Sequence, residues 1–312
     1  MRGSVGGSYL LRLIALVCLL FWGSGITLVF ARHSSKHYEV WLVDQSNSPG
    51  VSFGGTIHIY DGANLDRDRP SSTPANIIDL AGATTTLCLA TTGAAPVRPH
   101  MILFNSTHTH AILSFVTSGH VVIFDAASRT PLSCIHTSVG AGGARQAHAS
   151  FPAPDDSYIL VANQNGKLLE RINTDYATNT FTLDSAATLN LATCTTPNGI
   201  ACQAAGIRPD NAPICPLIDS TSTLGFVTLR GGGLFVVDAK AAPLAILGEY
   251  DLTTVHGNGC GGLEVRGSMY LNSGGGTATN LSEFDVYQFS LTGYTAANPP
   301  ILQRRLSCSR MT

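Results

Sequence analysis

Short apolar segments alternate with polar turns along most of this chain. In the clearest stretch, an apolar run at 100–104 is followed by a turn, a run at 111–116, a second turn and a run at 121–125. A fourth run follows at 131–135. The runs are rich in β-branched and aromatic residues, and Gly, Asn and Ser mark the turns. The pattern predicts four short strands joined by hairpins.

The same plan returns three more times along the chain. The units begin at His100-Met-Ile-Leu-Phe, His148-Ala-Ser-Phe-Pro, Cys215-Pro-Leu-Ile-Asp and Cys260-Gly-Gly-Leu-Glu. A further unit at the start has strand patterns at 38–44, 56–61 and 76–80, without a counterpart of the innermost strand. A repeat of this kind predicts the blades of a β-propeller. We therefore expect an all-β fold of four-stranded antiparallel blades, with very little helix after residue 38.

The third strands carry the most specific sequence pattern. They read Val-Val-Ile-Phe-Asp at 121–125 and Leu-Phe-Val-Val-Asp at 234–238, each after a glycine-containing turn. In this the chain resembles the YVTN/lactonase-like and quinoprotein amine dehydrogenase-like β-propellers, over residues 38 to about 305. The resemblance implies the fold, but it carries over no residue for lactone hydrolysis or for a quinone cofactor.

The number of blades is left open by the sequence. Five blade-like units are visible, whereas propellers of the resembled kind commonly have seven. Two readings remain: an incomplete seven-bladed ring in a truncated or partial chain, or a genuine ring of five or six blades.

The N-terminal segment predicts export. Arg2 and Arg12 precede an apolar stretch from Leu13 to Ala31, which ends in Val29-Phe-Ala31, a small-residue cleavage pattern. We interpret 1–31 as a signal peptide, followed by a propeller domain at 38–312 and a secreted or periplasmic location. The alternative is an uncleaved anchor, because about 19 apolar residues can just span a bilayer. That segment would be the only contact with a membrane.

Composition narrows the partners. The 18 Lys and Arg residues face 20 Asp and Glu, a formal charge of −2, so we expect no nucleic-acid partner. Cys18 lies in the predicted signal, which leaves seven of the eight cysteines for the exported chain. Disulfides are the expected state there. Cys194 and Cys202 are close in sequence within a loop pattern, and we expect them to pair.

The repeat also predicts a candidate metal site. His100, His148, Cys215 and Cys260 open the first strands of four units, and these strands line the central channel of a propeller. Two imidazoles and two thiolates at one level favour copper or zinc. The alternative is a Cys215–Cys260 disulfide beside two histidines that bind no metal. A second group, His108, His110 and His120, is a weaker candidate, because it falls in a polar turn.

These observations lead to a leading functional hypothesis and a rival. The first is an exported propeller that binds a metal or a small-molecule ligand at its channel mouth, with oxidoreductase activity as one outcome. The rival is a non-catalytic propeller that presents its loops to a protein or cell-surface partner. A lactonase-type hydrolase is disfavoured, because the channel positions are His and Cys and not metal-binding carboxylates.

Overall fold

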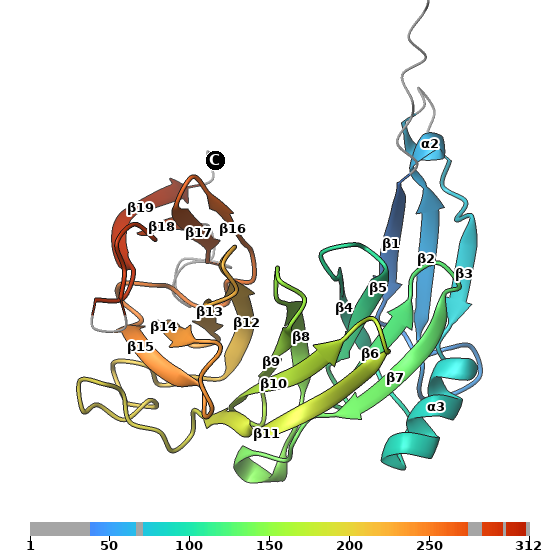
Figure 1. The fold of residues 1–312 in the computed structure, drawn as a ribbon, viewed down its shortest axis with the longest axis horizontal. Helices are drawn as coiled ribbons and strands as arrows, with labels where there is room; N and C mark the ends of the chain where they lie inside the picture. Colours follow the sequence, from blue (N-terminus) through green and yellow to red (C-terminus); the bar gives the residue numbers. More distant parts are fainter. Residues whose placement is uncertain (1–37, 67–70, 274–282, 296–297, 310–312) are drawn as a thin grey trace, which may run out of the picture.

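The computed structural model of the chain describes residues 38–66, 71–273, 283–295 and 298–309. Five antiparallel sheets follow one another around an arc that does not close into a ring (Figure 1). Within the described residues, helix is confined to the one-turn α2 (Gly62–Leu65), α3 (Ala83–Thr92) and a 3₁₀ turn, η1 (Ala141–Gly143). The predicted class, a propeller of antiparallel blades, is confirmed. The predicted signal peptide lies outside the described residues.

The sheets are built from consecutive strands in simple meanders. The first sheet has three strands, β1 (Glu39–Asp44), β2 (Thr56–Asp61) and β3 (Asn76–Asp79). The second and third have four each: β4 (Pro99–Phe104), β5 (His110–Phe115), β6 (His120–Asp125), β7 (Thr130–His136), and β8 (Ala147–Pro152), β9 (Tyr158–Asn163), β10 (Leu168–Asp175), β11 (Thr180–Asn190). The fourth and fifth comprise β12 (Pro213–Ile218), β13 (Leu224–Leu229), β14 (Leu234–Asp238), β15 (Ala245–Tyr250), and β16 (Gly262–Val265), β17 (Ser268–Asn272), β18 (Glu283–Ser290), β19 (Ile301–Ser309).

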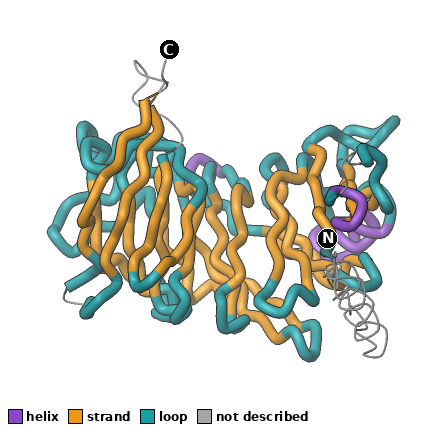
Figure 2. The backbone as a smooth tube through the Cα atoms, turned by 90° about the horizontal axis from the view of Figure 1, so that it is seen from above, coloured by secondary structure: helices purple, strands orange, loops and turns teal. Residues whose placement is uncertain are grey.

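Strand order agrees with the repeat found in the sequence. The first strands β4, β8, β12 and β16 lie on the concave side of the arc, and the fourth strands β7, β11, β15 and β19 lie on its convex side (Figure 1). The first sheet lacks an inner strand, as its sequence predicted. Seen from above, the strands of successive sheets stand side by side (Figure 2).

The core lies between the sheets and not in one central mass. The second strands β5, β9 and β13 are buried along their whole length, because both faces of each sheet pack on a neighbour. Trp41 and Ile57 of the first sheet pack with Phe124 of the second, and Phe226 of the fourth packs with Phe289 of the fifth. A strand buried on both faces needs a continuous apolar run rather than alternation.

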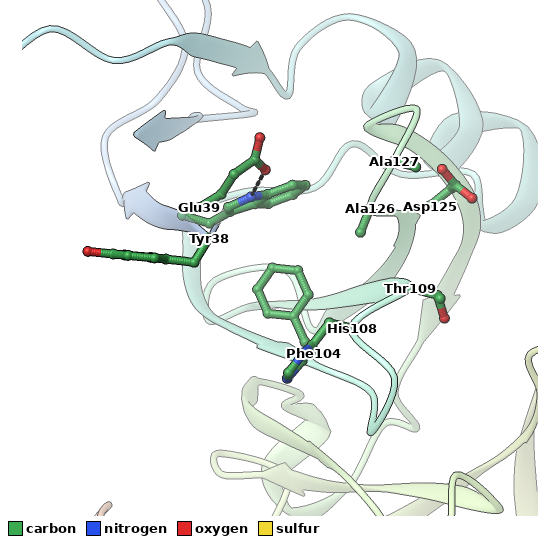
Figure 3. A pocket seen from close by; sticks show the side chains of 9 residues that line it. Tyr38, Glu39, Phe104, His108, Thr109, Asp125, Ala126 and Ala127 are labelled. Carbon is green, nitrogen blue, oxygen red and sulfur yellow. Dashed lines mark hydrogen bonds between the residues drawn. The ribbon is translucent and has the colours of Figure 1, made fainter. Parts of the chain in front are cut away.

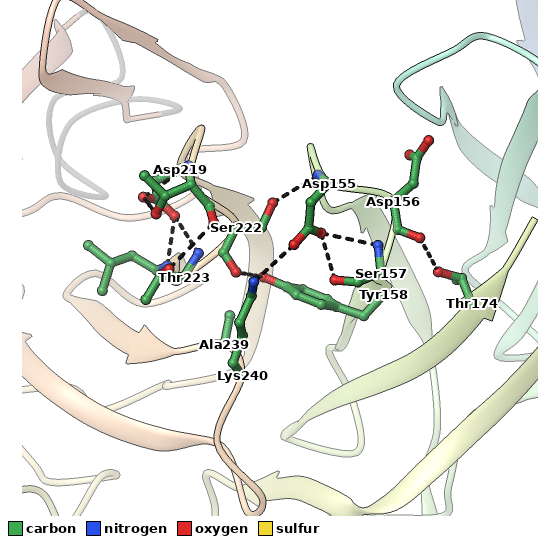
Figure 4. Close-up of polar contacts among 12 residues, drawn as sticks. Asp155, Asp156, Ser157, Tyr158, Thr174, Asp219, Ser222, Thr223, Ala239 and Lys240 are labelled. Carbon is green, nitrogen blue, oxygen red and sulfur yellow. Dashed lines mark hydrogen bonds and ion pairs between the residues drawn. The ribbon is translucent and has the colours of Figure 1, made fainter.

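Polar turns between the first and second strands link neighbouring sheets. They lie at the end of the sheets opposite to the end where the first strands begin. The backbone N–H of Asp155 donates to Ser222 Oγ at 2.9 Å, and the Tyr158 hydroxyl donates to the Ser222 carbonyl at 2.8 Å (Figure 4). Lys240 adds an ion pair to Asp155 at 2.9 Å. Between the second and third sheets, Asp156 accepts the N–H of Ser106 at 2.9 Å. These turns therefore hold neighbouring sheets together.

Three disulfides are present among the described residues. Cys194–Cys202 has a Cα–Cα distance of 5.4 Å, so the predicted local pair is confirmed. Cys88–Cys134 joins α3 to β7, and Cys215–Cys260 joins β12 to the segment before β16. The three bonds indicate an oxidising environment. In the part of the chain that is described, no helix has the length and apolar character needed to span a bilayer.

A buried ion pair supports the fourth sheet. Arg208 lies 2.6 Å from Glu249, and their side chains are 1% and 7% exposed. The guanidinium also donates through Nε to the Cys202 carbonyl and lies 5.0 Å from the centre of the Phe235 ring. Arg208 is therefore a structural residue, fixed by contacts within the fold.

Replacing Arg208 with Ala should lower the free energy of unfolding by about 3–5 kcal/mol, because Glu249 would remain buried without its counter-ion. Urea unfolding followed by circular dichroism measures the change. Arg129→Ala is the matched control: it removes a partly exposed pair with Glu39 and should cost less than about 1 kcal/mol. Equal losses in the two variants would contradict this account of Arg208.

Candidate functional site

The starts of three first strands, β4, β8 and β12, meet at the same end of their sheets. His100 is the second residue of β4, and His148 is the second residue of β8. Their ring centres are 4.6 Å apart, with planes tilted by 58°. Strand β12, the first strand of the fourth sheet, contacts this pair, because Nδ1 of His148 lies 3.0 Å from the carbonyl oxygen of Ile214. We call this end, defined by His100, His148 and Ile214, the channel mouth.

A β-bulge places each of these histidines. The ladder between β4 and β5 pairs Pro99 and then Met101, and His100 is the unpaired extra residue between them. The ladder between β8 and β9 likewise skips His148. A bulge turns one side chain away from the regular pleat, and such irregularities often occur next to functional sites. The same irregularity at the same position in two blades brings the two rings together.

Hydrogen bonds fix which ring nitrogen of each neutral histidine carries the proton. A carbonyl oxygen only accepts, so Nδ1 of His148 donates to Ile214 and Nε2 keeps a free lone pair. At His100, Nδ1 contacts the side-chain amide of Gln45, whose oxygen accepts from Arg98 at 3.3 Å. The Gln45 nitrogen therefore donates to His100, and the His100 proton sits on Nε2. The mouth thus combines an acceptor nitrogen with a donor N–H.

Both rings are held in the neutral form. Burial, followed by the neighbouring His100, lowers the pKa of His148 to about 4, although its bond to the Ile214 carbonyl acts the other way. Burial, and then the Arg98 guanidinium, also lowers the pKa of His100. Neutral imidazole is the form that binds metals. At neutral pH no proton has to leave before the lone pair of His148 can act.

The two predicted sulfur ligands are bonded to each other. Cys215 is fully buried and forms a disulfide with Cys260, which lies two residues before β16. The register shift of β12 falls between Pro213 and Pro216, so Ile214 and Cys215 share the bulge. The bond leaves His100 and His148 without a sulfur partner in this state. Metal ligation by His100, His148, Cys215 and Cys260 together remains a prediction.

The other candidate histidines do not converge. His108 has a positive φ of 57° in the turn before β5, and its ring faces Phe104. His110 begins β5, and its Nε2 lies 2.8 Å from Asn179 Oδ1. His120 begins β6 at the other end of the sheet. The three residues therefore form no common site.

A cavity of about 570 Å³ opens at the end of the first two sheets that lies opposite the mouth (Figure 3). Trp41 and Phe104 form its apolar wall, with ring centres 5.3 Å apart. The Trp41 indole donates to Glu39 at 2.8 Å, and Glu39 is paired with Arg129 at 2.6 Å. The carboxylate is already paired, and His108 of the weaker histidine group is the one predicted metal ligand among the residues that line this cavity.

One group of metal-capable side chains was not found from the sequence. Cys88, His120 and Cys134 place one ligand atom each within 4.8 Å of the others, and the described residues contain no second group of this kind. The group could hold a metal. No sequence spacing pointed to it, because Cys88 comes from a helix that the strand pattern did not predict.

Comparisons with known proteins bear on the fold. No protein-family profile matches the chain, and no curated protein matches it by sequence. Among solved structures, it resembles a candidate 6-phosphogluconolactonase from Bacteroides fragilis, with a TM-score of 0.56 and 10% identity. That match covers 86% of this chain and 67% of the other. The β-propeller domain of Cps50 (Swd1) from Myceliophteria thermophila matches with a TM-score of 0.53 and 10% identity, covering 87% and 76%.

A third similar structure is a complex of KlAtg21 with the coiled coil of AgAtg16, with a TM-score of 0.51 and 11% identity. The match covers 86% of this chain and 68% of the other. The chain therefore spans about two thirds of the length of the first and third of these structures. Together with the blade topology, these matches define the fold as a β-propeller. At such low identity they carry no residue roles.

Stability should fall as the pH is lowered from about 7.5 to 5. The pKa of His148 is about 4 and that of His120 about 3 in the folded chain, both below the ordinary 6.5. Between pH 6.5 and these lower pKa values, the two histidines are protonated in the unfolded chain but not in the folded chain. Their contribution to the free energy of unfolding is therefore full only above pH 6.5 and decreases as the pH falls. Melting temperatures recorded across this range measure the slope.

The variants His148→Gln and His120→Gln should each flatten that slope, since each removes a group that protonates on unfolding. His108→Gln, at an exposed turn position, is the control and should keep the parent slope. A parent melting temperature that does not change between pH 7.5 and 5 would refute the account.

Proposed function

We propose that this chain is an exported β-propeller that binds copper or zinc at its channel mouth, together with a small anionic ligand. The observation that carries the proposal is the pairing of His100 and His148 at matching bulges, 4.6 Å apart and neutral. His148 has the arrangement of a metal ligand: one ring nitrogen donates to a backbone carbonyl and the other is free.

The positive charge of two arginines at the channel mouth supports the binding of an anionic ligand beside the metal. The Arg98 guanidinium disfavours positive charge on His100, and Arg230 acts in the same direction on His148. A bare metal cation would be repelled by both. An anion bound beside the metal would offset the guanidinium charges, since arginine binds carboxylates and phosphates well. A small anionic molecule is therefore the expected companion, and with copper the pair would allow oxidoreductase chemistry.

His100 needs a change of tautomer before it can bind through Nε2. Its proton sits there because the Gln45 amide donates to Nδ1. Metal binding through Nε2 would move the proton to Nδ1, and the Gln45 amide would turn so that its oxygen accepts. Cys215 and Cys260 would join as thiolates only after reduction of their disulfide.

Equilibrium dialysis of the oxidised chain with Cu²⁺ or Zn²⁺, with and without acetate as the anion, followed by elemental analysis, tests the proposal. His148→Gln should lower metal affinity about tenfold or more, since even outer partners of a metal contribute that much. Gln45→Glu should raise it, because a carboxylate accepts from Nδ1 and frees Nε2 of His100. His108→Gln is the control. Unchanged binding in both mouth variants would refute the proposal.

A second candidate function is docking to a protein partner. The outer faces of the first and fifth sheets expose large apolar side chains: Leu42 and Ile77 on one, Leu263 and Ile301 on the other. Exposed apolar patches of this kind often mark interaction surfaces. Light scattering and cross-linking of the parent and of Leu263→Lys distinguish this function, since docking through that face should be lost in the variant. The mouth variants should leave it unchanged.

A further inference from the structure

A second metal-capable cluster lies at the seam between α3 and β7, away from the paired histidines of the mouth. Helix α3 lies against the outer strand of the second sheet (Figure 1). Cys88 comes from the helix, Cys134 from β7, and His120 from the start of β6. The two sulfurs and one nitrogen of His120 lie within 4.8 Å of one another. Three elements therefore bring one nitrogen and two sulfurs to a common point.

The cluster is enclosed by the fold. Cys88 and His120 are fully buried, and Cys134 is 5% exposed. The Cα atoms of the two cysteines are 5.2 Å apart. In the oxidised state the sulfurs are bonded to each other, and His120 lies beside the disulfide. Reduction of this bond would therefore leave two thiols beside a buried imidazole.

Polar neighbours orient the His120 ring. Its Nε2 lies 2.9 Å from Thr92 Oγ1, and its Nδ1 lies 2.8 Å from Ser118 Oγ. The Thr92 hydroxyl donates to the Cys88 carbonyl at 2.7 Å, so its oxygen is left to accept from His120. The His136 ring stacks on His120 at 3.9 Å. Hydroxyl partners can reverse their roles, so the ring can adopt either tautomer. The nitrogen that binds a metal gives up its own hydroxyl contact, while the other nitrogen keeps its contact as a donor.

We propose that this cluster is a redox-dependent metal site: Cys88, Cys134 and His120 bind zinc, or monovalent copper, when the disulfide is reduced. Two thiolates and one imidazole are preferred ligands of these metals. A water molecule or the Thr92 hydroxyl would take the fourth position. Disulfide and metal exclude each other, because the same two sulfur atoms form both. The site therefore holds metal under reducing conditions and releases it on oxidation.

The chemistry balances with a thiol as reductant. Two thiol molecules give two electrons and two protons to the Cys88–Cys134 bond, yielding two cysteine thiols and one small disulfide. Zinc binding then displaces the two thiol protons to solvent. In the reverse direction, a small disulfide takes two electrons from the cysteine thiolates and two protons from solvent, and it is cleaved to two small thiols. The Cys88–Cys134 bond forms again and Zn²⁺ leaves.

The test is a Co²⁺ titration of the full chain carrying Cys215→Ser and Cys260→Ser, which removes the thiolates that reduction would release at the channel mouth. The protein is reduced with a phosphine and kept free of oxygen, and the titration is followed by competition with Zn²⁺. We expect one thiolate-to-cobalt charge-transfer signal from this cluster, absent in the oxidised chain and displaced by zinc. Cys88→Ser should remove it. His120→Gln keeps both sulfurs and should weaken binding about tenfold or more, because even outer partners of a metal contribute that much. Circular dichroism of each reduced protein establishes that it is folded.

Two controls separate this site from the rest of the chain. The double variant Cys194→Ser with Cys202→Ser removes a disulfide whose sulfurs belong to no such group within the described part of the chain, and it should keep the signal. His148→Gln alters only the channel mouth and should also keep it, so this proposal and the proposed function can fail independently. A signal that survives in folded Cys88→Ser, or equal affinity in folded His120→Gln, would overturn the proposal.

Discussion

Each interior sheet buries both of its faces against its neighbours, and the rest of the structure depends on this packing. A second strand such as β9 has no solvent face, so all of its residues are buried. Burial of this kind contributes about 25 cal/mol for each Å² of apolar surface removed from water. It also fixes the positions of the strand ends, because a sheet held on both faces cannot slide. Side chains at those ends therefore start from fixed backbone positions, and local hydrogen bonds then orient them.

The arrangement of strands separates packing from chemistry. The turns between the first and second strands meet at one end of the sheets, where Asp155, Asp156 and Ser222 form contacts between sheets. Starts of the first strands meet at the other end, where His100 and His148 lie. Both ends are polar, but only the second pairs neutral imidazoles with nearby guanidinium groups. These groups are far apart in the sequence, but they lie close together because all the inner strands begin at the same end of the sheets.

Most of the fold followed from the sequence because continuous apolar runs and glycine turns are local signals. Helix α3 could not be predicted in this way, because Ala83–Thr92 contains five threonines, which have low helix propensity. Its stability comes from packing on β7, from the disulfide to Cys134, and from Gly93, which ends the helix at a φ of 75°. The Cys88–Cys134 bond was missed for the same reason. At the mouth, the repeat placed both histidines, but it could not show that β12 has two residues in its bulge.

The longer disulfides lie where an open arc is weakest. Cys88–Cys134 ties the connection that leaves the first sheet to the second sheet, and Cys215–Cys260 ties the fourth sheet to the start of the fifth. They span 46 and 45 residues, so each would stabilise the fold by about 4 kcal/mol through chain entropy. A sheet at the end of an arc has a neighbour on one face only. It would be the first to peel away under a pulling force or during digestion by a protease. Covalent links at these two junctions act against such peeling, much as ring closure does in a complete propeller.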